Sequence, residues 1–197
     1  DYLRRVGITW SAHPTRDDVQ KEYAVIWRQL GDRPIEALLH LPRMTDPGAR
    51  ATMDVLTSLV SPALFTDENL RALVIGRMGN LSLEHGNSDT SCYTYTAVGN
   101  VLALYFGDYH RGFRFAQLGL DQVEEHGTDR LKARVYLAFG NLAKAPIRHA
   151  PANRPLARHA FETAQRAGDL TYAVFSCNNI LTQLLASGDP LSEVQGD

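Results

Sequence analysis

Three glycines at a constant spacing constrain this chain more than any other feature. Gly86, Gly127 and Gly168 recur with a 41-residue period, and each lies between two segments with helical spacing of apolar residues. Self-similarity at such a period indicates helix pairs that bury their apolar faces only against neighbouring pairs. The spacing therefore predicts an all-α chain, built as a right-handed solenoid of antiparallel helix pairs.

The residues around each glycine indicate the end of one helix and the start of the next. Glycine adopts the left-handed conformation that ends helices, and Ser, Thr and Asp side chains accept hydrogen bonds from the first amides of the following helix. Such residues follow the glycines at Ser88, Thr128, Asp129 and Asp169. We therefore expect three repeats, at 86–126, 127–167 and 168–197.

Other positions keep the same register. The dipeptide Gly-Asn occurs at Gly99-Asn100 and again at Gly140-Asn141, and alanines recur at Ala116 and Ala157. Small residues let two helices approach closely. We expect them at the contacts within each helix pair.

The N-terminal part, 15–84, shows less regular helices. Thr15 opens a capping-box sequence, and Asp46-Pro47 combines an N-cap with a first-turn proline, so helices are expected to begin there. We expect no helix before Thr15, and we expect Pro62 to end the helix that begins at Pro47. Later helices are expected near 88–105, 109–125, 129–144, 155–167 and 170–187, which makes about nine in all.

Two segments are candidates for partner contact. The stretch 144–155 contains three prolines and four basic side chains where the other repeats have a short turn. It is either a solvated loop or a contact loop, since connecting segments often carry recognition; Arg148, His149 and Arg154 are its candidate contacts. The aromatic stretch 93–115 should mainly pack in the core, but one or two of its rings, with Tyr109 as the candidate, can face a partner.

Composition excludes several classes of function. The formal charge is −2 and the pI is about 6.4, so no basic field favours nucleic acid. The two cysteines, Cys92 and Cys177, suggest neither a metal pair nor a disulfide framework, which favours a reducing cytoplasm. No stretch approaches the roughly 20 apolar residues that cross a bilayer.

Sequence motifs for catalysis are also missing. The seven histidines do not form a zinc-ligand pattern, and His85 and His126 instead precede helix-ending glycines, where a cation complements the helix dipole. Neither a phosphate-binding glycine loop nor a nucleophile elbow occurs, and Ser91-Cys92 has no neighbouring base. We expect no catalytic residue, no metal site and no cofactor.

Four strings carry a resemblance to a known family: IEALL at 35–39, LPRMTDP at 41–47, LSLEHGNS at 81–88 and FGDY at 106–109. They resemble the tetratricopeptide-like region of very large bacterial signalling proteins. In those proteins a serine/threonine-kinase-like domain and a STAND-type AAA ATPase precede the helical region, and a GAF domain and a sensor histidine kinase follow it. The resemblance implies a tetratricopeptide-like superhelix without catalytic residues of its own.

These observations predict a single helical-repeat segment, 1–197, taken from a longer chain, with apolar helix faces left uncovered at its ends. Its expected function is interaction: it docks flanking domains of the same polypeptide, a partner protein or a second copy, and it couples an ATPase to a sensor kinase. The alternative is a module that senses a small effector in the groove between helix pairs.

Overall fold

The computed structural model describes residues 2–127, 129–142 and 154–187. These residues are all-helical, apart from turns and one isolated parallel bridge between Arg43 and Asn87. The helices are α1 Tyr2–Arg5, α2 Arg16–Leu30, α3 Pro47–Thr66, α4 Glu68–His85, α5 Ser91–Asn100, α6 Tyr109–His126, α7 Asp129–Leu142, α8 Arg154–Arg166 and α9 Leu170–Ser187. A 3-10 segment, Ile35–His40, and a π-helical turn, Val101–Tyr105, complete the set.

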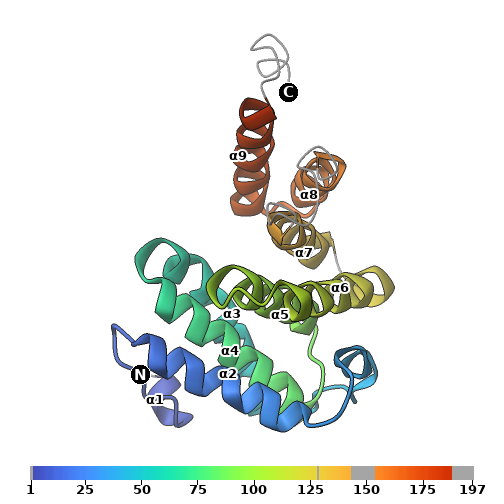
Figure 1. Cartoon of the computed structure of the whole chain (residues 1–197). Helices are drawn as coiled ribbons and strands as arrows, with labels where there is room; N and C mark the ends of the chain where they lie inside the picture. The colour runs from blue at the N-terminus through green and yellow to red at the C-terminus, as the bar shows by residue number, and fades with distance from the viewer. Residues whose placement is uncertain (1, 128, 143–153, 188–197) are drawn as a thin grey trace.

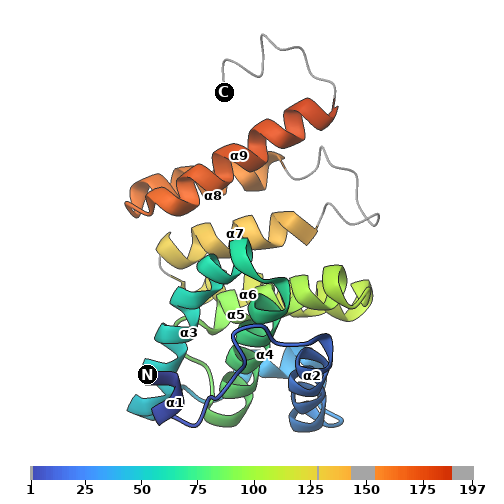
Figure 2. The same ribbon diagram turned by 90° about the vertical axis from the view of Figure 1, so that its left-hand side faces the viewer.

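The helices stack in layers (Figures 1 and 2). Helices α1 to α6 form one mass, which we call the body, and α7, α8 and α9 extend from it as an arm. Within the body, α4 packs against α2, α3 and α5, and α5 pairs with α6. Helix α7 connects the two parts, because it contacts α5 and α6 on one side and α8 and α9 on the other.

Local sequence explains most helix starts. The Thr15 side chain and Asp18 form the expected capping box at α2, and the Asp46 carboxylate accepts a hydrogen bond from an amide in the first turn of α3. Asp67 and Asp108 cap α4 and α6 in the same way. Each carboxylate or hydroxyl satisfies an amide that has no partner within the helix.

Two expectations about helix boundaries are wrong. A short helix, α1, precedes Thr15, whereas the helix expected near 88–105 is present as α5 and the π-helical turn that follows it. Helix α3 does not end at Pro62 but continues to Thr66. A proline removes one hydrogen bond, and the turn after it persists here because Ala63 is buried and Thr66 Oγ1 donates a hydrogen bond to the Pro62 carbonyl.

Glycines bring α5 and α6 unusually close together. A Cβ atom added to Gly99 would lie 2.4 Å from the Gly112 carbonyl oxygen, and one added to Gly119 would lie 2.3 Å from that of Cys92. The expected close approach at small residues is therefore confirmed in the first helix pair. Gly140, by contrast, has nothing within 4 Å of its would-be Cβ.

The repeat glycines do not share one conformation. Gly86 and Gly168 have φ values of 92° and 68°, as expected for helix-ending glycines, but Gly127 has φ −80°. The expectation of a left-handed glycine is therefore wrong at position 127. Space explains that glycine instead, since an added Cβ would lie 2.2 Å from Val123 Cγ2.

Two of the strings used for the family resemblance meet in space. The Asn87 amide donates to the Pro42 carbonyl at 2.8 Å, and the Met44 amide donates to the Asn87 carbonyl at 2.8 Å. The buried Asn87 side chain donates to the Leu38 carbonyl and accepts from the Tyr95 hydroxyl at 2.6 Å. Asn87 thus fixes the loop before α3 against the loop after α4.

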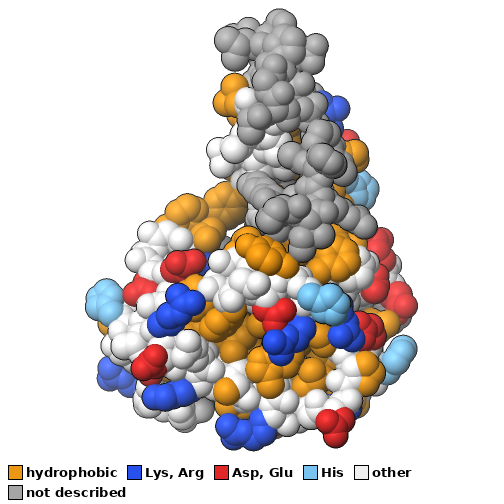
Figure 3. Space-filling view, viewed as in Figure 1, with side chains coloured by type: hydrophobic (Ala, Val, Ile, Leu, Met, Phe, Trp, Pro, Cys, Tyr) orange, Lys and Arg blue, Asp and Glu red, His pale blue; other side chains and the backbone are white. Residues whose placement is uncertain are grey.

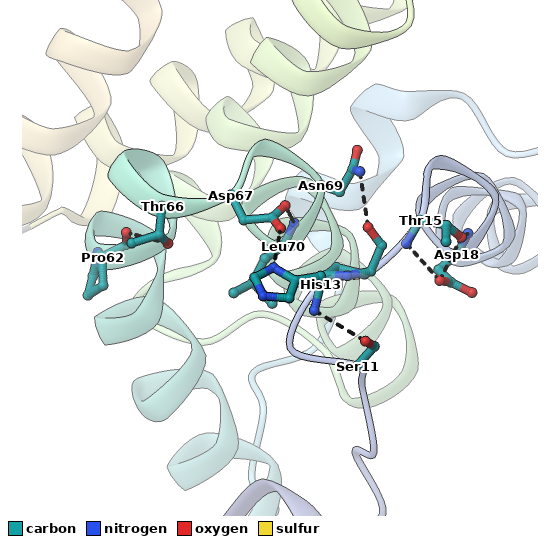
Figure 4. Close-up of polar contacts among 10 residues, drawn as sticks. Ser11, His13, Thr15, Asp18, Pro62, Thr66, Asp67, Asn69 and Leu70 are labelled. Atoms are coloured by element: carbon teal, nitrogen blue, oxygen red, sulfur yellow. Dashed lines mark hydrogen bonds and ion pairs between the residues drawn. The ribbon is translucent and has the colours of Figure 1, made fainter.

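The segment before α2 is tied to the start of α4 (Figure 4). Asn69 Nδ2 donates to the Pro14 carbonyl at 3.0 Å, and His13 Nδ1 lies 3.4 Å from an Asp67 carboxylate oxygen. Tyr105 donates to Asn69 Oδ1, so the same asparagine also contacts the π-helical turn.

None of the described helices combines the length and the apolar character needed to cross a membrane.

Candidate functional site

A groove lies where the body meets the arm. Its volume is about 500 Å³, and residues of α3, α4, α5, α7 and α9 line it. Polar and apolar side chains both contribute: two arginines, two tyrosines and several asparagines lie among leucines, alanines and phenylalanines. Grooves of this size, mostly apolar with a few converging polar groups, are typical binding sites.

The groove follows the 41-residue register of the sequence. Tyr93, Arg134 and Phe175 are successive residues at this spacing, from α5, α7 and α9, and all three line the groove. Asn100 and Asn141, the asparagines of the two Gly-Asn dipeptides, also line it. Residues at equivalent positions of α5, α7 and α9 therefore line the same groove.

Large apolar side chains remain exposed on the groove. Leu64, Phe65 and Leu104 line it and are 51%, 72% and 52% exposed. The Phe65 ring lies 5.9 Å from the Phe175 ring, centroid to centroid, which places the end of α3 beside α9. Hydrophobic side chains also gather on the surface where the body meets the arm (Figure 3). Clustered exposed apolar groups mark interaction sites more often than isolated ones do.

An aspartate at the start of α9 positions Arg134. The Arg134 Nη2 atom lies 3.1 Å from Asp169 Oδ2, and both side chains are largely buried, at 14% and 9% exposed. The guanidinium also stacks on the Tyr172 ring, 4.7 Å from its centroid. Arg130 reaches the same carboxylate oxygen at 3.4 Å. One carboxylate therefore serves two arginines and cannot neutralise both.

Two tyrosines meet at the wall of the groove. The Tyr172 hydroxyl donates to the Tyr93 hydroxyl across 3.4 Å. Burial raises the pKa of Tyr93 well above its usual range, and the nearby positive charges of Arg134 and Arg71 offset only part of that shift. Tyr93 is therefore a neutral hydrogen-bonding group, and not a base, at physiological pH.

Arg71 is the second arginine of the groove. It lies in the first turn of α4, is partly buried, and acts electrostatically on Tyr93 of α5 and Tyr23 of α2. Its side chain has neither a hydrogen bond nor an ion pair within the described part of the chain. The described lining residues include no acid, and Asp169, which lies behind Arg134, opposes the charge of that arginine but not that of Arg71.

Two buried polar atoms of lining residues also lack a partner within the described ranges. Asn100 Nδ2 donates to the Ala138 carbonyl at 2.9 Å, whereas Asn100 Oδ1 has no donor. Arg134 Nε is likewise unpaired, although its Nη2 contacts Asp169. Buried polar groups are usually satisfied, so unpaired ones on the wall of a groove suggest a ligand or water that completes them.

The residues proposed from sequence are not those of this groove. Tyr109 begins α6 and packs beside Ala103 of the π-helical turn, Ala116 of α6 and Leu142 of α7, and it is not among the residues that line the groove. Arg154 is the first residue of α8, and Arg148 and His149 lie outside the described residues, so the proposal for the loop stays a prediction. Among the aromatic stretch 93–115, it is Tyr93 that lines the groove.

A second cavity is larger, but fewer charged side chains line it. It has a volume of about 680 Å³ and lies beneath the N-terminal segment, between Leu3, Ile8 and Trp10 and helices α3 and α4. Arg4 is the only charged residue among its described lining. The N-terminal segment packs over α3 and α4 at this cavity, so we interpret the cavity as part of that packing and not as a binding site.

The nucleophilic side chains at the start of α5 serve structural contacts. Burial raises the pKa of the Cys92 thiol to about 12, so this thiol remains protonated and unreactive. Its neighbour Ser91 is buried and lies 2.9 Å from the Ser82 hydroxyl, a contact between α5 and α4. No group of three or more potential metal ligands occurs among the described residues.

Comparisons with known proteins add no family to these observations. No family model matches the chain, and neither the curated proteins nor the solved structures give a match. The candidate site is therefore defined by its geometry: a basic and apolar groove, lined at a 41-residue register, between the body and the arm.

Proposed function

We propose that this chain is a non-catalytic interaction module: a right-handed, tetratricopeptide-like solenoid whose inner face binds a protein segment. The supporting observation is that side chains from α5, α7 and α9, at equivalent positions of the repeat, line one groove beside exposed Leu64, Phe65 and Leu104. Stacked repeats typically form such extended binding surfaces.

The resemblance described above suggests where the segment acts. In a large bacterial signalling protein it would lie in the cytoplasm between an ATPase and a sensor histidine kinase, and its partner would be a flanking domain, another protein or a second copy. A nucleotide-dependent change would be transmitted through the stacked helices. Helix α7 is suited to that role because it packs against both the body and the arm.

Peptide selection on the purified chain tests the binding function. Random short peptides displayed on phage are selected on the wild-type chain, and the binders are then measured on two variants. Phe65→Asp places a charge in the groove, whereas Leu170→Asp changes a residue that is 76% exposed on α9 and is not among the groove lining. We expect Phe65→Asp to weaken binding about tenfold or more, and Leu170→Asp to leave it within about twofold.

Two results would contradict this function. The first is a selection that yields no specific binder. The second is a set of binders that Leu170→Asp weakens as much as Phe65→Asp does, because such peptides would not occupy the groove.

A small-molecule sensor is the second candidate function. It is favoured by the hydroxyls of Tyr93 and Tyr172 and the Asn100 amide, which come together at a groove of about 500 Å³. Thermal-shift screening against metabolites, with Tyr172→Phe as the groove variant, distinguishes the two. A specific compound that stabilises the wild type but not the variant would favour the sensor.

A further inference from the structure

The positive charge in the groove identifies the chemistry of its occupant. Arg71 has no carboxylate partner among the described residues, and Arg134 shares the single Asp169 carboxylate with Arg130. A guanidinium that is partly shielded from water binds a carboxylate in a bidentate geometry more favourably than it binds water. The groove therefore attracts a group with negative charge.

The remaining lining selects what kind of molecule carries that charge. Exposed Leu64, Phe65 and Leu104 need apolar partners, which a free anion does not supply. Nucleic acid fits poorly, because the chain has a formal charge of −2 and nucleic-acid binding depends on many basic contacts.

We propose that the groove binds a protein segment in which an aspartate or glutamate is flanked by apolar residues, with the carboxylate seated between Arg71 and Arg134. This inference rests on the proposed binding function and specifies its partner. The apolar residues of the segment cover the rim formed by Leu64, Phe65 and Leu104. The Tyr172 ring and Asp169 hold the Arg134 guanidinium in place before the segment binds. The Arg134 side chain therefore loses little conformational entropy on binding.

The same peptide selection tests the inference through its sequences. We expect the selected peptides to be enriched in Asp and Glu beside Leu, Ile or Phe, relative to the unselected library. Binding of one such peptide is then measured by fluorescence anisotropy with the wild type and with Arg71→Gln. We expect Arg71→Gln to weaken it about tenfold, and higher salt to reduce the difference.

A matched control and a double-mutant cycle make the test specific. Arg77→Gln removes an equal charge from the same helix, at a position outside the groove lining, and should change binding less than about twofold. Replacing the acidic residue of the peptide by its amide should remove the effect of Arg71→Gln, because the carboxylate and the guanidinium then no longer interact. Arg71→Lys should restore part of the affinity, and Arg134→Gln should show the same coupling as Arg71→Gln.

Different failures are distinguishable. If no peptide is selected, the binding function itself fails. If peptides bind in the groove without acidic enrichment, or without coupling to Arg71 or Arg134, only the proposed partner chemistry is overturned. A peptide with phosphoserine in place of the acid that binds more than about tenfold tighter would also overturn it, in favour of a phosphorylated partner.

Discussion

The body and the arm of this molecule are held together by different kinds of contact. The body buries large side chains in one continuous core, which runs through α2 to α6, includes Leu38, Met53, Leu56 and Phe115, and reaches Val135 of α7. The arm has two smaller clusters: one consists mainly of alanines with Leu137, Tyr136 and Tyr172, and the other contains Ala157, Ile180 and Leu184. Burial of apolar area stabilises in proportion to that area, so the arm gains less from it.

Ion pairs and a hydrogen bond join the helices of the arm to one another and to α6. Asp169 joins the start of α9 to Arg134 of α7, Arg166 of α8 lies 3.3 Å from Asp129 of α7, and Tyr136 hydrogen-bonds to Glu124 of α6. One face of α9 stays apolar and uncovered, with the exposed side chains Leu170, Val174 and Leu185. The arm is thus the part whose position is easier to change, and the groove lies where it joins the body.

A pair of glycine variants should show the largest difference between the two regions. Gly86 and Gly168 hold equivalent repeat positions, and both have positive φ. An added Cβ at Gly86 would lie 2.1 Å from the Pro42 carbonyl oxygen, whereas nothing lies within 4 Å at Gly168. We expect Gly86→Ala to lower the free energy of unfolding by roughly 2–5 kcal/mol, and Gly168→Ala by only about 1–2 kcal/mol.

Urea denaturation followed by circular dichroism measures both variants. Equal losses would show that backbone conformation alone sets the cost, and that the contact between the two loops adds nothing.

Two tyrosine variants provide the next comparison. Tyr95→Phe leaves the buried Asn87 Oδ1 without its hydroxyl donor, so we expect a loss of about 1–3 kcal/mol. Tyr172→Phe removes a long hydrogen bond of 3.4 Å in the arm and should cost less than half as much. Thermal unfolding of the two proteins measures the difference. A greater loss for Tyr172→Phe would contradict the expectation that the long Tyr172–Tyr93 hydrogen bond contributes less than the Tyr95–Asn87 one.

Asp169→Asn tests how far the arm depends on its ion pairs. The variant keeps a side chain that can cap α9 but removes the charge that Arg134 and Arg130 share. We expect a loss of about 1–2 kcal/mol and faster amide hydrogen exchange in α8 and α9, with exchange in α2 to α5 unchanged. Exchange that accelerates equally in both regions would show that they unfold as one unit.

The smallest effect concerns acid stability of the body. Hydrogen bonds from Arg114 of α6 lower the pKa of Glu36 from 4.5 to about 2. A carboxyl whose folded pKa is lowered contributes stability above its unfolded pKa, and this contribution is lost as the pH falls from about 4.5 to about 2. The pair is solvent-exposed, so water and salt screen most of its attraction, and we expect a smaller loss than in any variant above.

Melting temperatures of the wild type and Glu36→Gln, measured across this range, check that expectation. The two curves should converge at low pH. A difference that stays constant as the pH falls would mean that the carboxylate charge is not the cause.

Helix starts were the most predictable part of the fold. Thr15, Asp46 and Asp67 each bind amides three residues away, and such contacts depend only on residues within one turn. Helix continuation was less predictable: α3 passes through Pro62, and the burial of Ala63 that helps to hold the last turn depends on helices distant in sequence. Gly127 is a second example. A side chain at this position would collide with Val123, whereas its φ of −80° does not require glycine.

The candidate site was only partly accessible from sequence. The 41-residue register identified Asn100 and Asn141 as equivalent residues, and the same register applied to Tyr93, Arg134 and Phe175 would have marked the groove. Arg71 carried no such signal, because α4 precedes the regular repeats. Tyr109 was proposed for its place in an aromatic stretch, yet it packs beside Ala103, Ala116 and Leu142 and does not line the groove.

The sequence by itself determined the helical character of the chain, the 41-residue spacing and most of the helix starts, because these follow from residue spacing and from hydrogen bonds within a turn. Only the tertiary structure decided which faces of the helices meet. It brought Arg71 of α4 and Arg134 of α7 to one groove, paired Asp169 with Arg134, and joined the loop at Pro42 to Asn87. These contacts link residues 35 or more positions apart, so they depend on the packing of whole helices.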